Sequence, residues 1–408
     1  MSTDDPRRRL LRPNVLAWAV LGAIVVSFAA VVIAADGASS LAGRVGGDFP
    51  AFYGSGSIVA DGDLDRLYDF DRQLEAQLGL HHDAGALYFA YPPPVAGAYS
   101  LLALLGYVPA YVLHTLIMGA ALVAAFLVIR PMLPATRPEG PVIAAVAATF
   151  LPAFMAVTLG QNSAIVVLLV AASWRLARDG RDELAGLALG LLLFKPQYAV
   201  PLIGLYLVRG RWRLVGTSGL VAVGWWLAGV LMLGTSWVGD WVSQVGDFNT
   251  LDAEINGANA ISWLGMAEHV LGVSSTPALL VGGTLALATA TWLVVVWRRS
   301  ADDQLALPMA AASVGVLLIS PHAMFYDATL LLLGVAALAA AGHSLSTRLL
   351  AIAWGLGAMH PLKEVAGITP VSLVVLGALA VVLHMWWRSR RNAGAPHDGG
   401  LQVAGRTR

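Results

Sequence analysis

The sequence predicts an all-α polytopic membrane protein, with about twelve transmembrane helices and a long first extracytoplasmic loop. Of its 408 residues, 58% are hydrophobic and only 12% are charged, which is about half the charged share of a soluble globular protein. The apolar residues come in runs of about 20, the length that crosses a bilayer as a helix. These runs are rich in Leu, Ala, Val and Gly and lack the period-two alternation of a membrane β-strand, so we expect helices.

The predicted spans follow the apolar runs along the chain. They cover residues 14–35, 109–130, 141–158, 163–178, 183–195, 197–209, 214–234, 276–298, 304–320, 323–341, 348–360 and 368–387. Residues 92–106 are also apolar, but the segment is short and opens with Pro92-Pro93-Pro94. Proline suits only the first turn of a helix, so we expect a re-entrant or surface-lying helix here. The Arg-rich start is compatible with a signal peptide, but the length of the first run favours a retained span.

The basic residues predict which side of the membrane each loop occupies. Nearly all of them fall on one side of the predicted map, namely Arg7–Arg12, Arg130, Arg137, Arg175, Arg178, Arg181, Arg209, Arg211, Arg213, Arg298, Arg299, Arg348, Arg388, Arg390 and Arg391. The positive-inside rule makes that side cytoplasmic. A spanning 92–106 segment would reverse all later loops and scatter this bias.

This map predicts a single transmembrane domain over 1–391 with two long outer loops, 36–91 and 235–275. Short helices are expected near 50–60 and 69–79 in the first loop. The polar, Gly-rich tail, 392–408, is predicted to be disordered and cytoplasmic. The abundance of Arg, Ala and Gly is typical of a GC-rich bacterial genome, so we expect a bacterial cell membrane. The distribution of the basic residues predicts that the site faces outward.

Composition excludes several classes of site. The net charge is +0 and there is no cysteine, so nothing indicates a nucleic-acid partner, a disulfide or a thiolate metal site. Phosphate-binding loops, dinucleotide fingerprints and HExxH zinc motifs are missing from the sequence. We expect no metal and no cofactor. His81-His82-Asp83 is a weak metal pattern, and an exposed loop is the simpler interpretation.

Polar residues gather at the predicted outer ends of several helices. They lie in Gly46-Gly47-Asp48-Phe49 with Tyr53, in Tyr91-Pro92-Pro93, in Gly160-Gln161-Asn162, in Lys195-Pro196-Gln197, and in Ser320-Pro321-His322 with Asp327. Ionisable groups at membrane depth cost about 2.5–3.5 kcal/mol on insertion scales, so they are functional candidates. Polar residues with purely structural roles would be expected on both sides of the membrane, so their location on one side indicates a shared site.

Each candidate also has a structural interpretation. Asp48 follows two glycines that let the backbone approach a substrate, and its carboxylate suits a general base or the N-cap of a helix at 50–60. Lys195 precedes a proline that splits 183–209 into two half-helices. Its ammonium could bind a phosphate, or its side chain could extend along the helix to the membrane interface. Gln161 and Asn162 suit sugar hydroxyls or a polar turn. His322 and Asp327 suit proton transfer, phosphate binding or an interfacial cap.

Together these segments resemble glycosyltransferase family 87, within the GT-C superfamily of polyprenyl-phosphate-sugar-dependent enzymes. The resemblance rests on Asp48-Phe49 with Tyr53, Leu67-Tyr68-Asp69, Tyr91-Pro92-Pro93, Gly160-Gln161-Asn162, Lys195-Pro196-Gln197 with Arg211-Trp212-Arg213, and Ser320-Pro321-His322 with Asp327. The matches are short, but they fall in order over residues 46–327. Known members include a mycobacterial α-1,2-mannosyltransferase that acts on phosphatidylinositol mannosides.

The resemblance implies an inverting hexosyl transfer, with mannose as the expected sugar. It implies that the acidic residue of the first outer loop, here Asp48, is catalytic. The expected partners are a polyprenyl-phosphate-mannose donor, a lipid or glycolipid acceptor and membrane lipids. Lys195 and His322 are expected at the donor phosphate, with His322 also catalytic. Sugar or acceptor contacts are expected from Tyr53, Tyr91, Gln161, Asn162, Gln197 and Asp327.

Two other functions fit the same sequence. A flippase or transporter of lipid-linked sugars would carry out no chemistry. Such transporters often contain inverted repeats and broken helices at mid-membrane, whereas this sequence has no evident repeat and one broken helix near the outer edge. A ligase or polymerase of lipid-linked glycans would differ only in transferring a chain. The long acidic first outer loop favours the transferase.

Overall fold

The computed structural model describes residues 46–80, 87–133, 149–300, 305–343 and 345–393. Within these ranges the chain forms helices joined by loops and contains no strand; Ala260 and Met324 form an isolated bridge. The predicted all-α class is confirmed for this part of the chain. The predicted first span, the His81-His82-Asp83 pattern and the tail beyond 393 lie outside the described residues.

Four helices are long and apolar enough to cross a membrane: α7 (Tyr107–Ile129), α13 (Trp212–Leu233), α16 (Thr276–Arg299) and α21 (Val371–Ala393). The helices α9 (Leu151–Thr158) and α10 (Ser163–Arg178) meet at an angle of 112° and make a fifth candidate if they form one broken span. The expected number of about twelve spans is therefore not confirmed. Other apolar helices are shorter, including α12 (Pro196–Val208), α17 (Ala306–Ile319) and α19 (Thr347–Ala358).

Two causes account for the short helices. Some apolar segments are interrupted by a proline, and others form buried helices at the centre of the molecule. The predicted half-helices around Lys195 are confirmed as α11 (Asp182–Leu191), the 3-10 turn η3 (Leu192–Phe194) and α12, with Pro196 in the first turn of α12. Helix α17 is buried at every position from Pro308 to Leu318, so it forms the centre of the molecule rather than a lipid-facing span. It packs against α16, α21 and α18 (Leu331–Ala340).

The segment predicted as the first outer loop contains the two short helices that the sequence predicts, α4 (Phe49–Ala60) and α5 (Phe70–Gln77). The guanidinium of Arg72 donates hydrogen bonds to Asp61 and Asp63 and so joins α5 to the turn after α4. The next helix, α6 (Pro93–Ala103), has 11 residues. It is too short to cross a bilayer, which takes about 20.

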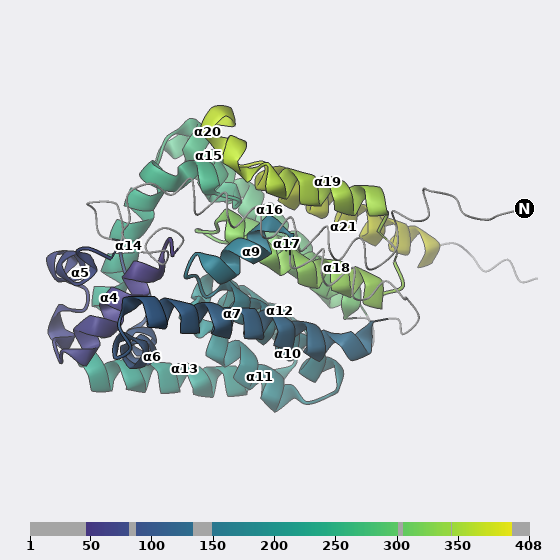
Figure 1. The fold of residues 1–408 in the computed structure, drawn as a ribbon. Helices are drawn as coiled ribbons and strands as arrows, with labels where there is room; N and C mark the ends of the chain where they lie inside the picture. The colour runs from purple at the N-terminus through teal and green to yellow at the C-terminus, as the bar shows by residue number, and fades with distance from the viewer. Residues whose placement is uncertain (1–45, 81–86, 134–148, 301–304, 344, 394–408) are drawn as a thin grey trace, which may run out of the picture.

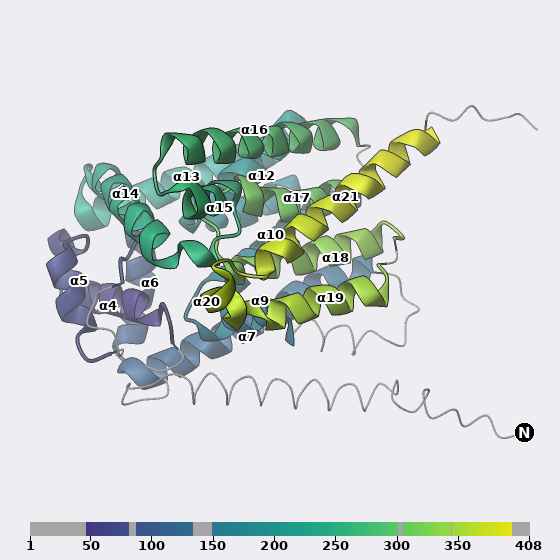
Figure 2. The ribbon, with the colours of Figure 1, turned by 90° about the horizontal axis from the view of Figure 1, so that it is seen from above.

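The remaining elements complete the molecule. They are α14 (Trp237–Asn256), α15 (Trp263–Leu271), α20 (Lys363–Ala366) and the 3-10 segments η1 (Leu64–Arg66), η2 (Arg130–Met132), η4 (Gly257–Asn259), η5 (Phe325–Leu330) and η6 (His360–Leu362). Helices α4, α5, α6 and α14 lie at one end of the bundle, and Figure 2 shows α18 and α19 side by side with α21 running diagonally past them. The site described below lies between these groups of helices.

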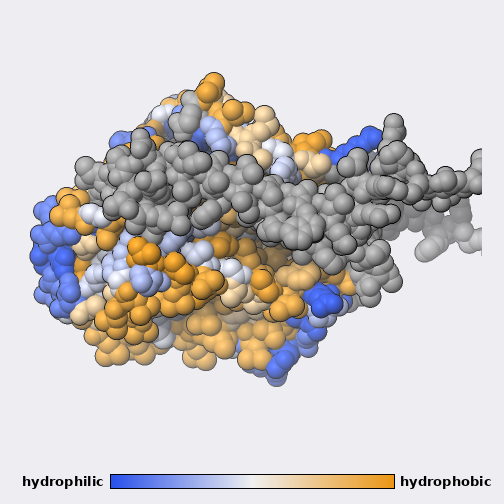
Figure 3. Space-filling view, in the orientation of Figure 1, coloured by the Kyte–Doolittle hydropathy of each residue, from blue (hydrophilic) through white to orange (hydrophobic). Residues whose placement is uncertain are grey.

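The arginine-rich helix ends lie at the opposite end of the bundle (Figure 1). There Arg211 pairs with Asp182 at 2.8 Å, and Arg209 donates to the carbonyl of Trp297 at 2.9 Å, so the ends of α11, α12, α13 and α16 meet. In Figure 3 hydrophobic residues dominate the visible face below the grey residues, and hydrophilic residues lie toward its left and right ends. This distribution is typical of a membrane protein.

Candidate active site

Asp48 is fixed by a close approach of the segment before α4 to the turn between α9 and α10. The backbone N–H of Asp48 donates to the carbonyl of Leu159 at 2.8 Å. Gly47 and Gly160 have φ of +44° and +77°, and a Cβ on Gly160 would lie 2.4 Å from that of Phe49. Only glycine tolerates both the conformation and the contact. Gly47 thus allows the close approach to Leu159, and the predicted approach of a substrate to this backbone stays a prediction.

The side chain of Asp48 is directed at Gln161 rather than at its own helix. It precedes α4 but makes no side-chain capping bond. Instead Oδ2 accepts a hydrogen bond from Nε2 of Gln161, whose Oε1 accepts from the hydroxyl of Tyr91 at 3.4 Å. The structure therefore does not support the capping role that the sequence left open. It leaves Asp48 available for chemistry.

The surroundings of Asp48 favour its protonated form more than water does. Burial raises the pKa of Asp48 to about 6, while the hydrogen bond from Gln161 opposes the rise and the negative charge of Asp252 adds to it. The residue is nevertheless partly exposed. A carboxylate with a pKa near the working pH accepts a proton more effectively than an ordinary aspartate.

Lys195 forms a buried ion pair beside this carboxylate. Its Nζ lies 3.2 Å from Oδ1 of Asp327 and 3.3 Å from Oγ of Ser163, and both side chains of the ion pair are only 4% exposed. Ser163 Oγ also donates to Asp327 at 2.6 Å. An ammonium has three N–H donors, so after Asp327 and Ser163 one remains for a phosphate oxygen.

His322 lies on the turn between α17 and η5. Its Nδ1 is 3.6 Å from Oδ2 of Asp252, and its ring contacts Phe248 edge-on with centroids 5.1 Å apart. Ser320 donates from its hydroxyl to the carbonyl of His322 at 2.6 Å and so shapes the turn. Burial lowers the pKa of His322, while the nearby Asp252 carboxylate opposes that shift.

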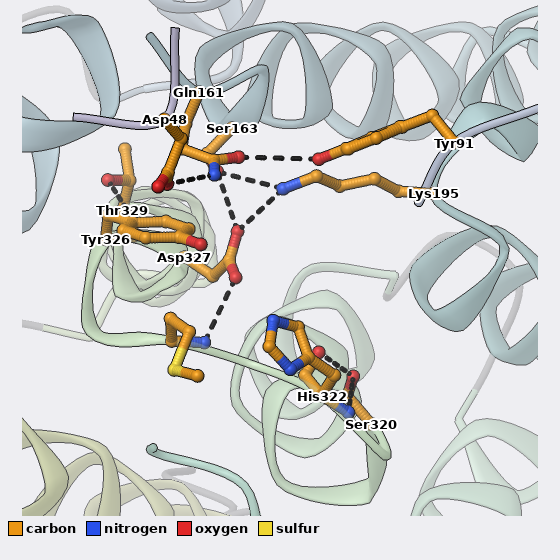
Figure 4. A network of polar contacts seen from close by, with 11 residues as sticks. Asp48, Tyr91, Gln161, Ser163, Lys195, Ser320, His322, Tyr326, Asp327 and Thr329 are labelled. Carbon is orange, nitrogen blue, oxygen red and sulfur yellow. Dashed lines mark hydrogen bonds and ion pairs between the residues drawn. The ribbon is translucent and has the colours of Figure 1, made fainter. Parts of the chain in front are cut away.

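Figure 4 shows which predicted residues the fold brings together. In the network drawn there, Asp48, Gln161 and Tyr91 form one hydrogen-bonded group, and Lys195, Ser163 and Asp327 form a second group beside it. His322 lies on the turn next to this network. These residues come from the start of α4, the segment before α6, the α9–α10 turn, the α11–α12 break and η5. The fold therefore brings these predicted residues close together, and a shared functional role for them stays a prediction.

The other predicted contacts lie elsewhere. The hydroxyl of Tyr53 donates to the carbonyl of Ala103 at 3.3 Å, so this side chain packs against α6. Asn162 is buried and accepts from Tyr99 at 2.7 Å. Gln197 lines a separate groove. The structure therefore does not place these three side chains in the network. The backbone at each position directs the side chain toward other neighbours.

Sequence reasoning missed Ser163 and Asp252. Ser163 bridges the ion pair and directly follows Gly160-Gln161-Asn162, so its position beside a candidate motif was a usable signal. Asp252 shares the second outer loop with several acids and has no distinguishing spacing. In the described ranges no group of three or more His, Asp or Glu side chains is arranged to hold a metal ion.

Two cavities adjoin the turn that carries His322, and Pro321 lines both. The larger is an open groove of about 490 Å³ between α12 and α16, lined by Pro196, Gln197, Val200, Pro201, Ala286, Leu287, Ala290, Ile319 and Pro321. All of these except Gln197 are apolar. The smaller pocket, of about 110 Å³, lies on the side of α14 and α15 and is lined by both polar and apolar residues.

Comparison with known proteins gives one match. The family model described as Glycosyltransferase family 87 matches residues 89–321, more than half of the chain. The matched range contains Tyr91, Gln161, Lys195 and Asp252, whereas Asp48, His322 and Asp327 lie outside it. No curated protein matches the sequence.

Proposed function

The chain belongs to glycosyltransferase family 87, and from this membership we propose that it transfers a hexose from a polyprenyl-phosphate donor to a lipid or glycolipid acceptor. Mannose is the proposed sugar, with an α-1,2 linkage as in the resemblance above. The proposed location is the outer face of a bacterial cell membrane. The observation that carries the chemistry is a partly exposed carboxylate, Asp48, beside a buried ammonium, Lys195.

Asp48 acts as the general base in this proposal. The acceptor hydroxyl gives its proton to the Asp48 carboxylate as its oxygen forms a bond to the anomeric carbon of the donor. The bond from that carbon to the phosphate oxygen breaks, and the lipid phosphate leaves with the electron pair. Attack opposite the leaving group inverts the anomeric configuration. A single carboxylate suffices because a phosphate needs little help from an acid, unlike the leaving groups of glycosidases.

In this scheme Lys195 neutralises charge on the leaving phosphate, and His322 donates a hydrogen bond to it. The remaining N–H donor of Lys195 would bind one phosphate oxygen while Asp327 and Ser163 hold the ammonium in place. His322 lies on the turn beside the network and can add a second donor. Charge-assisted hydrogen bonds of this kind are about twice as strong as neutral ones.

The groove between α12 and α16 supports a lipid-linked donor. It begins at Pro196, next to Lys195, and at Pro321, next to His322. An apolar groove next to two potential cations suits a molecule with a hydrocarbon chain and a phosphate, and it does not suit a nucleotide. Gln197 is the polar side chain in the lining and is proposed to contact the donor there. Family membership favours this transferase over a flippase without chemistry.

A direct assay tests the proposal. Purified protein is incubated with a short polyprenyl-phosphate-mannose and a membrane lipid extract, and products are identified by mass spectrometry. The expected result is a lipid carrying one additional hexose, with release of polyprenyl phosphate. Transfer from other polyprenyl-phosphate hexoses is measured in parallel. Movement of the intact donor across a vesicle membrane with no new product would favour the flippase and contradict the proposal.

The pH dependence of the reaction is expected to follow Asp48. Below the pKa of about 6 the carboxylate is protonated and cannot accept a proton. Under acceptor-limited conditions, kcat/KM is therefore expected to fall about tenfold per pH unit below that value. A requirement for protonated His322 would act in the opposite direction, with activity lost as pH rises. A rate that stays level down to pH 4 would contradict the base assignment.

Thiol labelling tests the proposed orientation, since the chain has no cysteine of its own. Leu64→Cys and Thr250→Cys lie in the two outer loops and are expected to react with an impermeant reagent on intact cells. Ala135→Cys and Ser300→Cys are expected to react only after the cells are opened. Reaction at 135 or 300 on intact cells would mean that 92–106 spans the membrane or that the orientation is reversed.

A further inference from the structure

His114 is a buried titratable residue that the proposed mechanism does not use. It lies on α7 and is only 1% exposed. Its ring packs against Phe49 with centroids 5.1 Å apart, and against Tyr99 of α6 with centroids 5.7 Å apart. A polar ring buried among aromatic rings costs free energy unless it makes hydrogen bonds. The hydrogen bonds of His114 therefore indicate what this residue contributes.

A chain of hydrogen bonds leads from His114 to the turn between α9 and α10. The hydroxyl of Tyr99 donates to Oδ1 of Asn162 at 2.7 Å and lies 3.1 Å from Nδ1 of His114. Because this hydroxyl has a single proton, Nδ1 carries the proton of the second bond and donates to Tyr99. His114 thus fixes the hydroxyl that holds the side chain of Asn162.

The residues held in this way are direct neighbours of the proposed base and its hydrogen-bond donor. Asn162 follows Gln161, whose side chain donates to the base. Phe49 follows the base itself, Asp48. Asp48 and Gln161 point at each other (Figure 4), while the residue after each of them packs into the cluster around His114. One imidazole therefore contacts the residue after the base directly and the residue after its donor through a tyrosine hydroxyl.

We propose that His114 is a positioning residue for Asp48, because it fixes the α9–α10 turn that carries Gln161. A second side chain of α7, that of Tyr111, donates to the carbonyl of Thr158 at 2.7 Å and holds the other side of the same turn. His114 touches no reacting atom in this role. The role depends on the proposed function, in which Asp48 is the base, and adds to it the group that keeps the base aligned.

A turn that moves would change the pH dependence of transfer. Burial raises the pKa of Asp48 to about 6, and the hydrogen bond from Gln161 limits that rise. A weaker bond would raise the pKa further, and transfer would then decline at a higher pH, because a protonated carboxylate accepts no proton. The other charges that act on Asp48 are those of Asp252, Lys195 and Asp327, which lie on α14, at the α11–α12 break and on η5. A substitution on α7 leaves them in place.

His114→Phe tests the role because it keeps an aromatic ring in the cluster and removes the hydrogen bond to Tyr99. The acid limb of kcat/KM is expected to move up by about one pH unit, roughly the contribution of one hydrogen bond to an ionised group. At pH values well above this limb kcat is expected to fall about tenfold, because the base is misaligned, with an unchanged KM for the donor. His114→Asn is expected to restore most of the loss, since its amide N–H can replace that of Nδ1.

Two further variants separate positioning from packing. Tyr99→Phe removes the hydroxyl in the middle of the chain, so its effects should match those of His114→Phe, and the double variant should be no worse than either. Met118→Ala lies one turn further along α7 and loses buried packing in the cluster that contains Ala164 of α10. It should lower the melting temperature in detergent and leave the acid limb in place.

The pH profiles also distinguish this role from the function on which it depends. An acid limb that stays near pH 6 in folded His114→Phe and Tyr99→Phe would overturn the positioning role and leave Asp48 as the base. If His114→Phe fails to fold, Tyr99→Phe provides the same test. A wild-type protein that transfers no sugar, or whose rate has no acid limb, would contradict the proposed function or the base, and the positioning role with it.

Discussion

Asp48→Asn is expected to lower kcat about 10²–10⁴-fold, the usual contribution of a positioned general base. Asparagine keeps the size of the side chain and an oxygen that can accept from Gln161, so the network around it should persist. Because Asp48 makes no capping bond to α4, its replacement should leave the melting temperature in detergent nearly unchanged. Steady-state rates with saturating donor and acceptor measure the effect.

Asp65→Asn is the matched control for this substitution, since Asp65 lies in the same outer loop and is exposed. Its rate is expected to equal that of the wild type. Residual activity in Asp48→Asn should also lose the decline below pH 6, because the titrating base is gone. A folded Asp48→Asn protein that kept more than about a tenth of the wild-type rate would contradict the role of Asp48 as base.

Lys195→Ala is expected to affect both stability and donor binding. It leaves the Asp327 carboxylate buried without its cation, a change that typically costs about 3–5 kcal/mol. The melting temperature should therefore fall, and KM for the polyprenyl-phosphate donor should rise because a phosphate contact is lost. Lys195→Arg should restore activity only in part, because a planar guanidinium does not replace a compact ammonium.

A double variant, Lys195→Met with Asp327→Asn, separates these two effects because both buried charges disappear together. In the wild type Asp327 accepts from Ser163 Oγ at 2.6 Å and from the Met324 N–H at 3.2 Å. The new amide oxygen can still accept from the N–H of Met324, and the hydroxyl of Ser163 can turn to accept from the amide nitrogen. The polar groups around position 327 therefore keep hydrogen-bond partners.

Replacing a buried ion pair by uncharged groups is often close to neutral for stability. The double variant should therefore recover most of the melting temperature that Lys195→Ala loses, and it should keep the raised donor KM. Thermal unfolding in detergent and steady-state kinetics with varied donor measure the two effects separately. Recovery of the donor KM as well would show that Lys195 acts only through the ion pair.

Local patterns in the sequence predicted most of the helices. The expected span 163–178 coincides with α10, and 276–298 agrees with α16 to within one residue. The break at Lys195 was also predictable, because a proline after it cannot continue the hydrogen-bond ladder of the preceding helix. These features depend on residues close together in the chain. The expected number of spans was less secure, because apolar runs also form central helices such as α17.

The composition of the site was predicted only in part. The prediction that Gln161, Lys195 and Asp327 lie at helix ends on one side of the membrane placed them near one another. It did not show which way each side chain points. Asn162 follows Gln161 directly, yet the two lie in different surroundings, one bonded to Tyr99 and the other to Asp48. For Asp252 the sequence offered no distinguishing pattern, and its place beside His322 depends on how α14 packs.

Composition and neighbouring residues were enough to predict the helical class, the apolar segments and the break before Pro196, whereas Asp48 as the base is a proposal that also depends on the family resemblance. Only the tertiary structure decided which polar groups share a site. Asp48 and Gln161 are 113 positions apart, and Lys195 and Asp327 are 132 apart. Such contacts form only when several helices pack together, and no local periodicity records which faces will meet.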